Sequence, residues 1–172
     1  ECNKNPKMPC SEYRCKSLGQ ACEIVNKGTE NELCVWVHKE DTQAPKIVPW
    51  DEALSPDGLK YYPDRTISPP NTGYKILKQP EGCLPAFSNM QFGIKTVDEK
   101  RGAPEPAQCR ADFELKNSYS EMQFLFGGDN LFAQEHKQIL KVPSPFTQEE
   151  GDAPVIHNNG EYTLFVRCID AN

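Results

Sequence analysis

Cysteines are the residues of this 172-residue chain with the clearest chemistry, and there are eight: Cys2, Cys10, Cys15, Cys22, Cys34, Cys83, Cys109 and Cys168. No two are separated by only two residues, the spacing at which a short loop usually points two ligands at one zinc ion. The same absence excludes a thioredoxin-type or haem-attachment motif. An even number of cysteines outside such motifs is typical of disulfides formed in an oxidising compartment. We therefore expect an extracellular or cell-surface protein.

The distribution of the cysteines constrains their pairing. Five lie in residues 1–41 and three in residues 42–172. If all are paired, an odd number of disulfides must join the two segments. Cys109 and Cys168 both lie on the apolar face of a predicted strand, so we expect a bridge between them. Cys83 is then expected to bridge to the N-terminal segment.

Other reactive residues form no catalytic pattern. The three histidines, His38, His136 and His157, belong to no metalloprotease motif and adjoin no known nucleophile motif. His136 is expected to make a structural hydrogen bond. The sequence therefore predicts a protein without enzymatic activity and without a cofactor.

Five aromatic residues in the first half of the chain offer a different chemistry, since exposed tryptophan and tyrosine rings can stack on sugars: Trp36, Trp50, Tyr61, Tyr62 and Tyr74. They predict a carbohydrate-binding surface as one interpretation. The opposing interpretation is that the same rings pack in the core or at an interface.

Composition excludes two classes of protein. The formal net charge is −6 and the pI is about 5.1, which argues against a general nucleic-acid binder. No apolar run approaches the roughly 18 residues of a membrane-spanning helix. We therefore expect neither a nucleic-acid partner nor a transmembrane segment.

The elements that must position these residues are mostly short strands. Residues 1–41 form a cysteine-rich segment, with a helix expected over 11–18 and strands over 21–25 and 33–37. Seven prolines in residues 49–85 predict edge strands and loops there.

The remainder of the chain shows strands of alternating apolar and polar residues. They are expected over residues 74–77, 90–97, 107–115, 135–142 and 161–170, with residues 121–126 ambiguous between strand and helix. Short strands without a βαβ rhythm predict an all-β fold, an antiparallel sandwich over residues 42–172.

Two stretches resemble a known class of module. Residues 160–172, Gly-Glu-Tyr-Thr-Leu-Phe-Val-Arg-Cys-Ile-Asp-Ala-Asn, are similar to the last strands of Ig-like and fibronectin III-like (Fn3-like) modules in prokaryotic cell-surface proteins, archaeal ones included. The run from Asp41 to Pro45 resembles the linker that opens such modules. The resemblance implies an Ig-like or Fn3-like sandwich with a small disulfide-rich N-terminal subdomain. It also implies calcium at the opening and closing aspartates, Asp41 and Asp170, where the alternative is solvated surface charge.

The function that follows is that of a non-enzymatic structural or adhesive module. Such a module would be a subunit or repeat of a surface filament, surface layer or adhesin, and its partners would be further copies or neighbouring modules. The long insertions at residues 49–90 and 143–160 are expected binding or assembly surfaces. The alternative is a carbohydrate-binding or accessory module of a secreted hydrolase.

Overall fold

The structure, a computed structural model, describes residues 2, 5, 7–37, 40–142 and 160–172. Its one α-helix and ten strands in these residues are α1 (Glu12–Leu18), β1 (Cys22–Val25), β2 (Leu33–Trp36), β3 (Lys46–Pro49), β4 (Leu59–Pro63), β5 (Tyr74–Lys78), β6 (Asn89–Val97), β7 (Ala107–Asp112), β8 (Phe124–Leu125), β9 (Glu135–Lys141) and β10 (Phe165–Asp170), with short 3₁₀ turns at Asp51–Ala53 and Tyr119–Glu121. Most of the expected insertion at residues 143–160 lies outside the described residues, as do His38 and His157.

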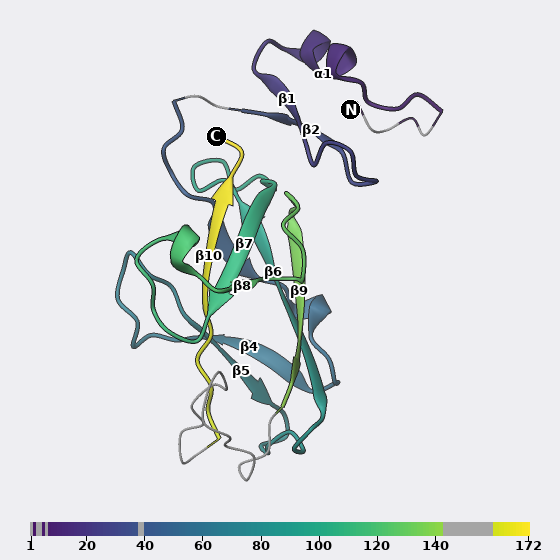
Figure 1. Ribbon diagram of the computed structural model, residues 1–172. Helices are drawn as coiled ribbons and strands as arrows, with labels where there is room; N and C mark the ends of the chain where they lie inside the picture. Colours follow the sequence, from purple (N-terminus) through teal and green to yellow (C-terminus); the bar gives the residue numbers. More distant parts are fainter. Residues whose placement is uncertain (1, 3–4, 6, 38–39, 143–159) are drawn as a thin grey trace.

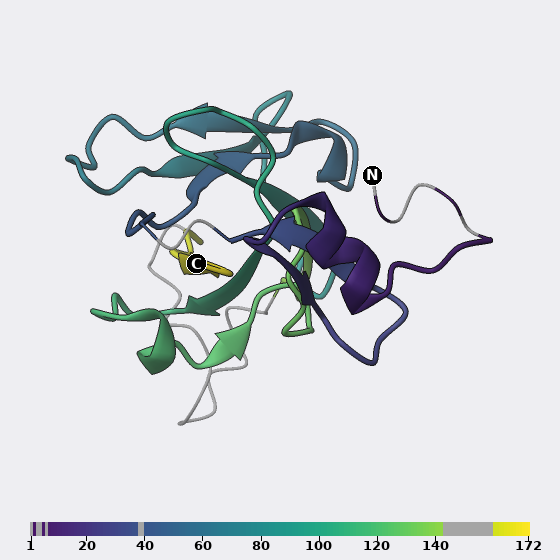
Figure 2. The ribbon, with the colours of Figure 1, turned by 90° about the horizontal axis from the view of Figure 1, so that it is seen from above.

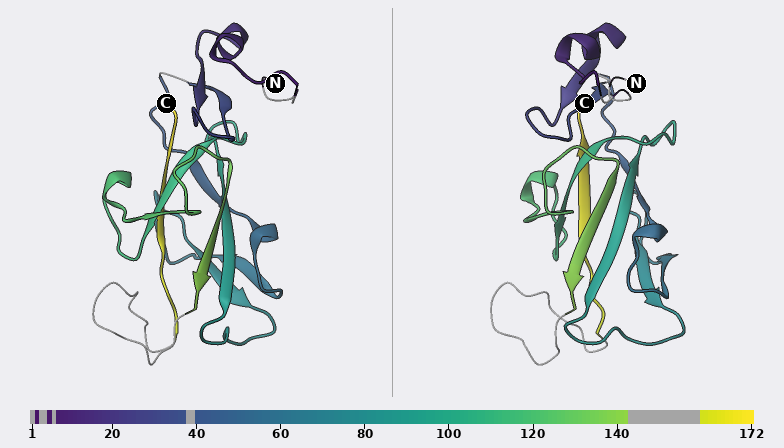
Figure 3. Two further views of the ribbon diagram at one scale, coloured as in Figure 1. Left: turned by 45° about the vertical axis from the view of Figure 1, so that its right-hand side comes forward. Right: turned by 90° about the vertical axis from the view of Figure 1, so that its right-hand side faces the viewer.

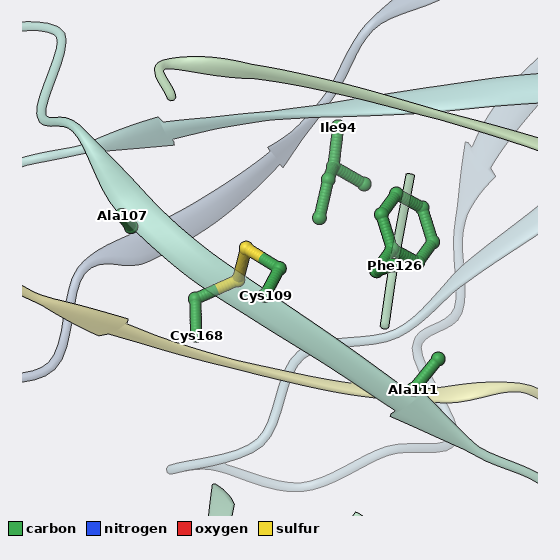
Figure 4. Packing of buried hydrophobic residues seen from close by; sticks show 6 residues of the cluster. All are labelled: Ile94, Ala107, Cys109, Ala111, Phe126 and Cys168. Carbon is green, nitrogen blue, oxygen red and sulfur yellow. A yellow bond between two sulfur atoms is a disulfide. The ribbon is translucent and has the colours of Figure 1, made fainter. Parts of the chain in front are cut away.

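Two three-stranded sheets form the main body, in the orders β3-β6-β9 and β10-β7-β8, and every pairing is antiparallel (Figure 1). Side chains of both sheets meet in one apolar core (Figure 4). Its buried members are Ile94 of β6, Cys168 of β10, Phe126 just after β8, and Ala107, Cys109 and Ala111 of β7. The two sheets thus form an all-β, antiparallel main body that is loosely compatible with a β-sandwich.

The last strand follows its sequence pattern. Leu164 and Val166 pack against the core beside the buried Cys168, as the alternation over residues 161–170 predicts. Regular strand geometry starts only at Phe165. The alternating pattern therefore identified the inward face correctly but placed the start of the strand too early.

Strand β7 ends earlier than the pattern predicts, at Asp112 instead of at residue 115. The Asp112 side chain accepts hydrogen bonds from the backbone N–H groups of Glu114 (3.0 Å) and Gln123 (3.2 Å). These bonds turn the chain out of the sheet, because an aspartate acceptor two residues back stabilises a turn. Leu115, expected on the apolar face, is 61% exposed.

The proline-rich region supplies a hairpin at the side of the main body. Among the described strands, β4 and β5 pair with each other and with no other strand, in agreement with the edge strands expected there. Pro63 takes the last position of β4, where its missing N–H is tolerated at a strand end.

The N-terminal segment lies at one end of the two sheets (Figure 3), and Figure 2 looks onto this end. Ser11 caps α1 by accepting a hydrogen bond from the Arg14 N–H at 3.3 Å, as the sequence predicts. The β1–β2 hairpin contacts the main body through Asn26, whose amide donates to the Phe132 carbonyl (2.9 Å) and accepts from its N–H (2.7 Å). The boundary between residues 41 and 42 stays a prediction.

Within the described residues, no helix has the length and apolar character needed to cross a membrane.

Candidate functional site

Two of the five predicted aromatic residues, Trp50 and Tyr61, contact Gly93 in the middle of β6, and a third, Tyr74, contacts Tyr61. A side-chain carbon on Gly93 would lie 2.6 Å from Ala53 Cβ and 2.9 Å from Trp50 Cε3. Only glycine therefore allows the Trp50 ring and the turn after it to pack on the strand. The Trp50 N–H donates to the Gly93 carbonyl at 3.1 Å, which fixes the start of that turn.

The Tyr61 hydroxyl completes the backbone pairing of Gly93. It donates to the Gly93 carbonyl at 2.7 Å and accepts from the Gly93 N–H at 3.1 Å. Burial raises the pKa of Tyr61 to about 12, and the charge of Asp51 adds to this against the opposing effect of the bond to Gly93. The hydroxyl therefore stays protonated and remains a donor at any physiological pH.

Two lysines approach the Trp50 ring. The ammonium nitrogens of Lys95 and Lys137 lie 4.8 Å and 4.5 Å from its centroid, distances typical of cation–π contacts. Lys95 also forms an ion pair with Glu135 at 3.0 Å. A sugar ring stacking on Trp50 would have to displace these cations, so the geometry favours packing for this residue.

The remaining predicted aromatic residues differ in their surroundings. Tyr74 contacts Tyr61 edge to face, with ring centroids 6.4 Å apart, and is 38% exposed. Tyr62 instead bonds the Gln79 side chain, and Trp36 of β2 lies 5.2 Å from the Arg101 guanidinium. The structure thus brings together Trp50, Tyr61 and Tyr74, and leaves Trp36 and Tyr62 outside the group.

The two aspartates expected to bind calcium line one shallow hollow. Asp41 and Asp170 border it, with Thr42 to Ala44 on one side and Ile169 and Asn172 on the other. The neighbouring Glu105 responds to both: burial raises its pKa to about 7, reinforced by the charges of Asp170, Asp98 and Asp41 and opposed by Arg101. Carboxylates from distant parts of the sequence therefore share one electrostatic environment here.

Metal-ligand geometry is a stricter test than shared environment. Within the described ranges, the one group that brings three ligand atoms within 4.8 Å of one another is Cys2, Cys10 and Cys34. All three sulfurs are engaged in disulfides. Asp41 and Asp170 belong to no such group of histidine, cysteine and carboxylate ligands in the described residues, so calcium there stays a prediction.

The disulfides agree in part with the sequence. Cys109 and Cys168 are bridged as expected, and Cys2–Cys10 and Cys15–Cys34 are the other two pairs. The expected bridge from Cys83 to the N-terminal segment is wrong: Cys83 is an exposed free thiol, and Cys22 is free as well. The expectation assumed complete pairing. With six cysteines paired, no bridge has to cross between the two segments.

The bridge between Cys109 and Cys168 lies within one sheet. The two residues face each other across β7 and β10, with Cα atoms 4.1 Å apart, close to the 4.5 Å of facing residues in a non-hydrogen-bonded antiparallel position. The bond therefore secures β10 to β7 within one sheet, and the two sheets are joined by the apolar core and by backbone hydrogen bonds such as the pair between Ala107 and Ala133.

His136 is the one histidine among the residues that the structure describes. His136 of β9 is 5% exposed, and its Nε2 lies 3.0 Å from the Ala133 carbonyl, in agreement with the structural role expected from the sequence. Burial lowers the pKa of His136, so the ring is neutral at physiological pH.

Sequence reasoning missed the residues that organise these groups. Gly93 carries one signal, a glycine inside an otherwise regular strand pattern, which often marks close approach by another group. Asn26 carries a weaker signal, because asparagine in a turn is tolerated in the left-handed region of backbone angles. The structure places it there, with φ of 57°. No local signal identifies Glu105, because its neighbours come from three other segments.

Comparison with models of known protein families, with curated proteins and with solved structures finds no match to the chain.

Proposed function

We propose that the chain is a non-enzymatic structural or adhesive module of an extracellular assembly, a subunit or repeat of a surface filament, surface layer or adhesin. Two observations carry the proposal: the main body is all-β and antiparallel, and six of the eight cysteines of the chain are in disulfides. Disulfides persist where the environment is oxidising, and they stabilise segments too small to build a sufficient core.

The proposed relation to Ig-like or Fn3-like modules is supported by the last strand. The residues of the Tyr-x-Leu-x-Val-x-Cys run that should point inward include Leu164, Val166 and Cys168, and these contact the core. One feature differs from antibody domains, whose conserved disulfide joins two sheets, because Cys109 and Cys168 belong to neighbouring strands of one sheet.

Strand addition is a means by which such a module could bind a further copy. Both strands of the two-stranded β1–β2 sheet are edge strands, and β2 carries the 59% exposed Trp36. Outer strands present backbone groups to which an extended segment can pair. The strand expected over residues 33–37 lies in a segment stabilised by disulfides. Its backbone is therefore ordered before association, which reduces the conformational freedom lost on binding.

Assembly is tested by electron microscopy and sedimentation velocity of the full chain under non-reducing conditions, across a range of concentrations. Filaments, sheets or concentration-dependent oligomers are the expected result. In a second preparation, Trp36→Ala should weaken association, whereas Tyr13→Ala, which alters a ring that is 85% exposed on α1, serves as the matched control. Monodisperse monomer at every concentration would refute the proposal.

Carbohydrate binding is the second candidate, and the specific observation in its favour is the Trp50–Tyr61–Tyr74 group. Tyr74 is the best probe because its ring is exposed and bonds no part of Gly93, so its loss should spare the fold. Binding on a glycan array that Tyr74→Ala abolishes and Tyr13→Ala preserves would support this function. An array without binding would remove it.

A further inference from the structure

The N-terminal segment concentrates five sulfur atoms in one small cluster. Buried Cys2, Cys10 and Cys15 form its centre, and Cys34 and Cys22 pack against them. Two disulfides, Cys2–Cys10 and Cys15–Cys34, account for four of these sulfurs. The fifth, Cys22, is a half-buried free thiol. A free thiol beside disulfides can attack one of them as a thiolate and exchange places with one of its sulfurs.

The two disulfides are near neighbours. The Cys34 sulfur lies within 4.8 Å of both the Cys2 and the Cys10 sulfur, while it is bonded to Cys15 at 2.05 Å. A thiolate released at Cys34 would therefore stand close to a second disulfide. The cluster is an arrangement in which one exchange can lead to another.

Cys22 is placed next to the end of helix α1. Its sulfur is 3.4 Å from the position that a side-chain carbon would take on Gly19, and its N–H donates to the Gly19 carbonyl at 2.9 Å. In the hairpin, Cys22 faces Trp36, and Cys34 faces Ile24. Cys22 and Cys34 are thus diagonal neighbours at roughly 7–8 Å, too far for a disulfide without backbone movement. Cys15 belongs to helix α1, which contacts β1, and Cys22 packs against the buried cluster that contains Cys15, so we take Cys15 as its partner.

We propose that this five-cysteine cluster is a thiol–disulfide exchange site in which Cys22 is the resident nucleophile. The Cys22 thiol loses its proton to solvent, and its thiolate attacks the Cys15 sulfur. The Cys15–Cys22 bond forms as the Cys15–Cys34 bond breaks, and the electron pair leaves on Cys34. That thiolate either takes a proton from solvent or attacks the Cys2–Cys10 disulfide in turn.

Each step exchanges one disulfide for another, so no oxidant or reductant is consumed. The segment then holds the same number of bridges in more than one pairing, and the free thiol moves among Cys22, Cys34 and the Cys2–Cys10 pair. The inference does not depend on the proposed function, since it concerns only the chemistry of the N-terminal segment.

The sequence makes this exchange easy to measure, because tryptic cleavage puts each of the five cysteines in a different peptide: residues 1–4, 8–14, 15–16, 17–27 and 28–39. The full, unreduced chain is incubated at pH 8.5 or at pH 5, where thiolate is scarce. Free thiols are then alkylated with N-ethylmaleimide at mildly acidic pH, and the linked peptides are mapped by mass spectrometry.

After alkaline incubation we expect a new linked pair of peptides, 15–16 with 17–27, and alkylation of Cys34, Cys2 or Cys10 in at least about a tenth of the molecules. Cys83→Ser should leave this redistribution unchanged, and both Cys22→Ser and Cys22→Ala should abolish it. The proposal is overturned if alkylation stays confined to Cys22 and Cys83 at both pH values. It is equally overturned if redistribution survives in either Cys22 variant or requires Cys83.

Discussion

Replacing Cys109 and Cys168 by alanine should remove a large share of the stability of the main body. The bridge closes a sequence separation of 59 residues. With the chain-entropy relation, such a loop restricts the unfolded chain by about 14 cal/mol/K, or about 4 kcal/mol at 25 °C. Alanine is preferred to serine because both sites are nearly inaccessible and a buried hydroxyl without a partner adds a cost of its own.

The assay is urea unfolding followed by tryptophan fluorescence in a Trp36→Phe background, so that the signal reports on Trp50 in the main body. Measurements below pH 6 keep thiolates scarce and so limit disulfide scrambling. The matched control removes Cys2 and Cys10, whose separation of 8 residues gives about 2.5 kcal/mol by the same relation. Because that bridge lies in the N-terminal segment, its loss should leave the unfolding of the main body nearly unchanged.

The reasoning is refuted if the double alanine variant loses less than about 1 kcal/mol. It is also refuted if the control destabilises the main body by as much, because the cost would then not depend on which loop the bridge closes.

Three further changes test other parts of the structure. Gly93→Ala should cost about 1–3 kcal/mol, the usual range for overpacking, since the added carbon would meet Trp50 at 2.9 Å; unaltered urea unfolding would contradict this. Because its folded-state pKa is raised to about 7 from 4.5, Glu105 favours the fold below about pH 4.5 and loses that contribution as pH rises through 7; the urea midpoint should therefore fall less between pH 5 and 7.5 in Glu105→Gln than in the natural chain. Asn26→Ala should loosen the hairpin by about 1–3 kcal/mol, from three lost side-chain hydrogen bonds, two with Phe132 and one to the Asn31 carbonyl, and from a less tolerated backbone conformation. Hydrogen exchange of residues 22–36 measures this, and Asn26→Gly keeps the backbone conformation and isolates the loss of the side-chain bonds.

Periodicity predicted strands of both sheets. The alternation over residues 90–97, 135–142 and 161–170 locates β6, β9 and β10, although β10 begins later, at Phe165. In β9 one face is more buried than the other, whereas β6 is covered on both faces at Gly93 and Ile94. The same reasoning paired Cys109 with Cys168, since both lie on inward faces. Alternation cannot show where a side chain ends a strand, which is why Asp112 ends β7 earlier than predicted.

Contacts between distant segments were beyond the sequence. Asn26 and Phe132 are 106 residues apart, and neither position has an unusual neighbourhood. Glu105 becomes perturbed only because Asp41 and Asp170 are brought near it by folding. The predicted bridge from Cys83 to the N-terminal segment, which came from the even number of cysteines, failed for a related reason. A count gives the number of possible bridges, whereas pairing requires that two Cα atoms approach within about 7 Å.

The Cys109–Cys168 bond also has a mechanical consequence. Cys168 lies two residues before the C-terminal end of β10, so tension applied to that end passes through the disulfide into β7. Strand β10 therefore cannot be peeled away from β7 residue by residue. The chain between the two cysteines is shielded from the load. At about 3.4 Å per extended residue, a separation of 59 residues withholds about 200 Å of length from stretching. In single-molecule pulling, reduction of this bond would appear as that much additional extension.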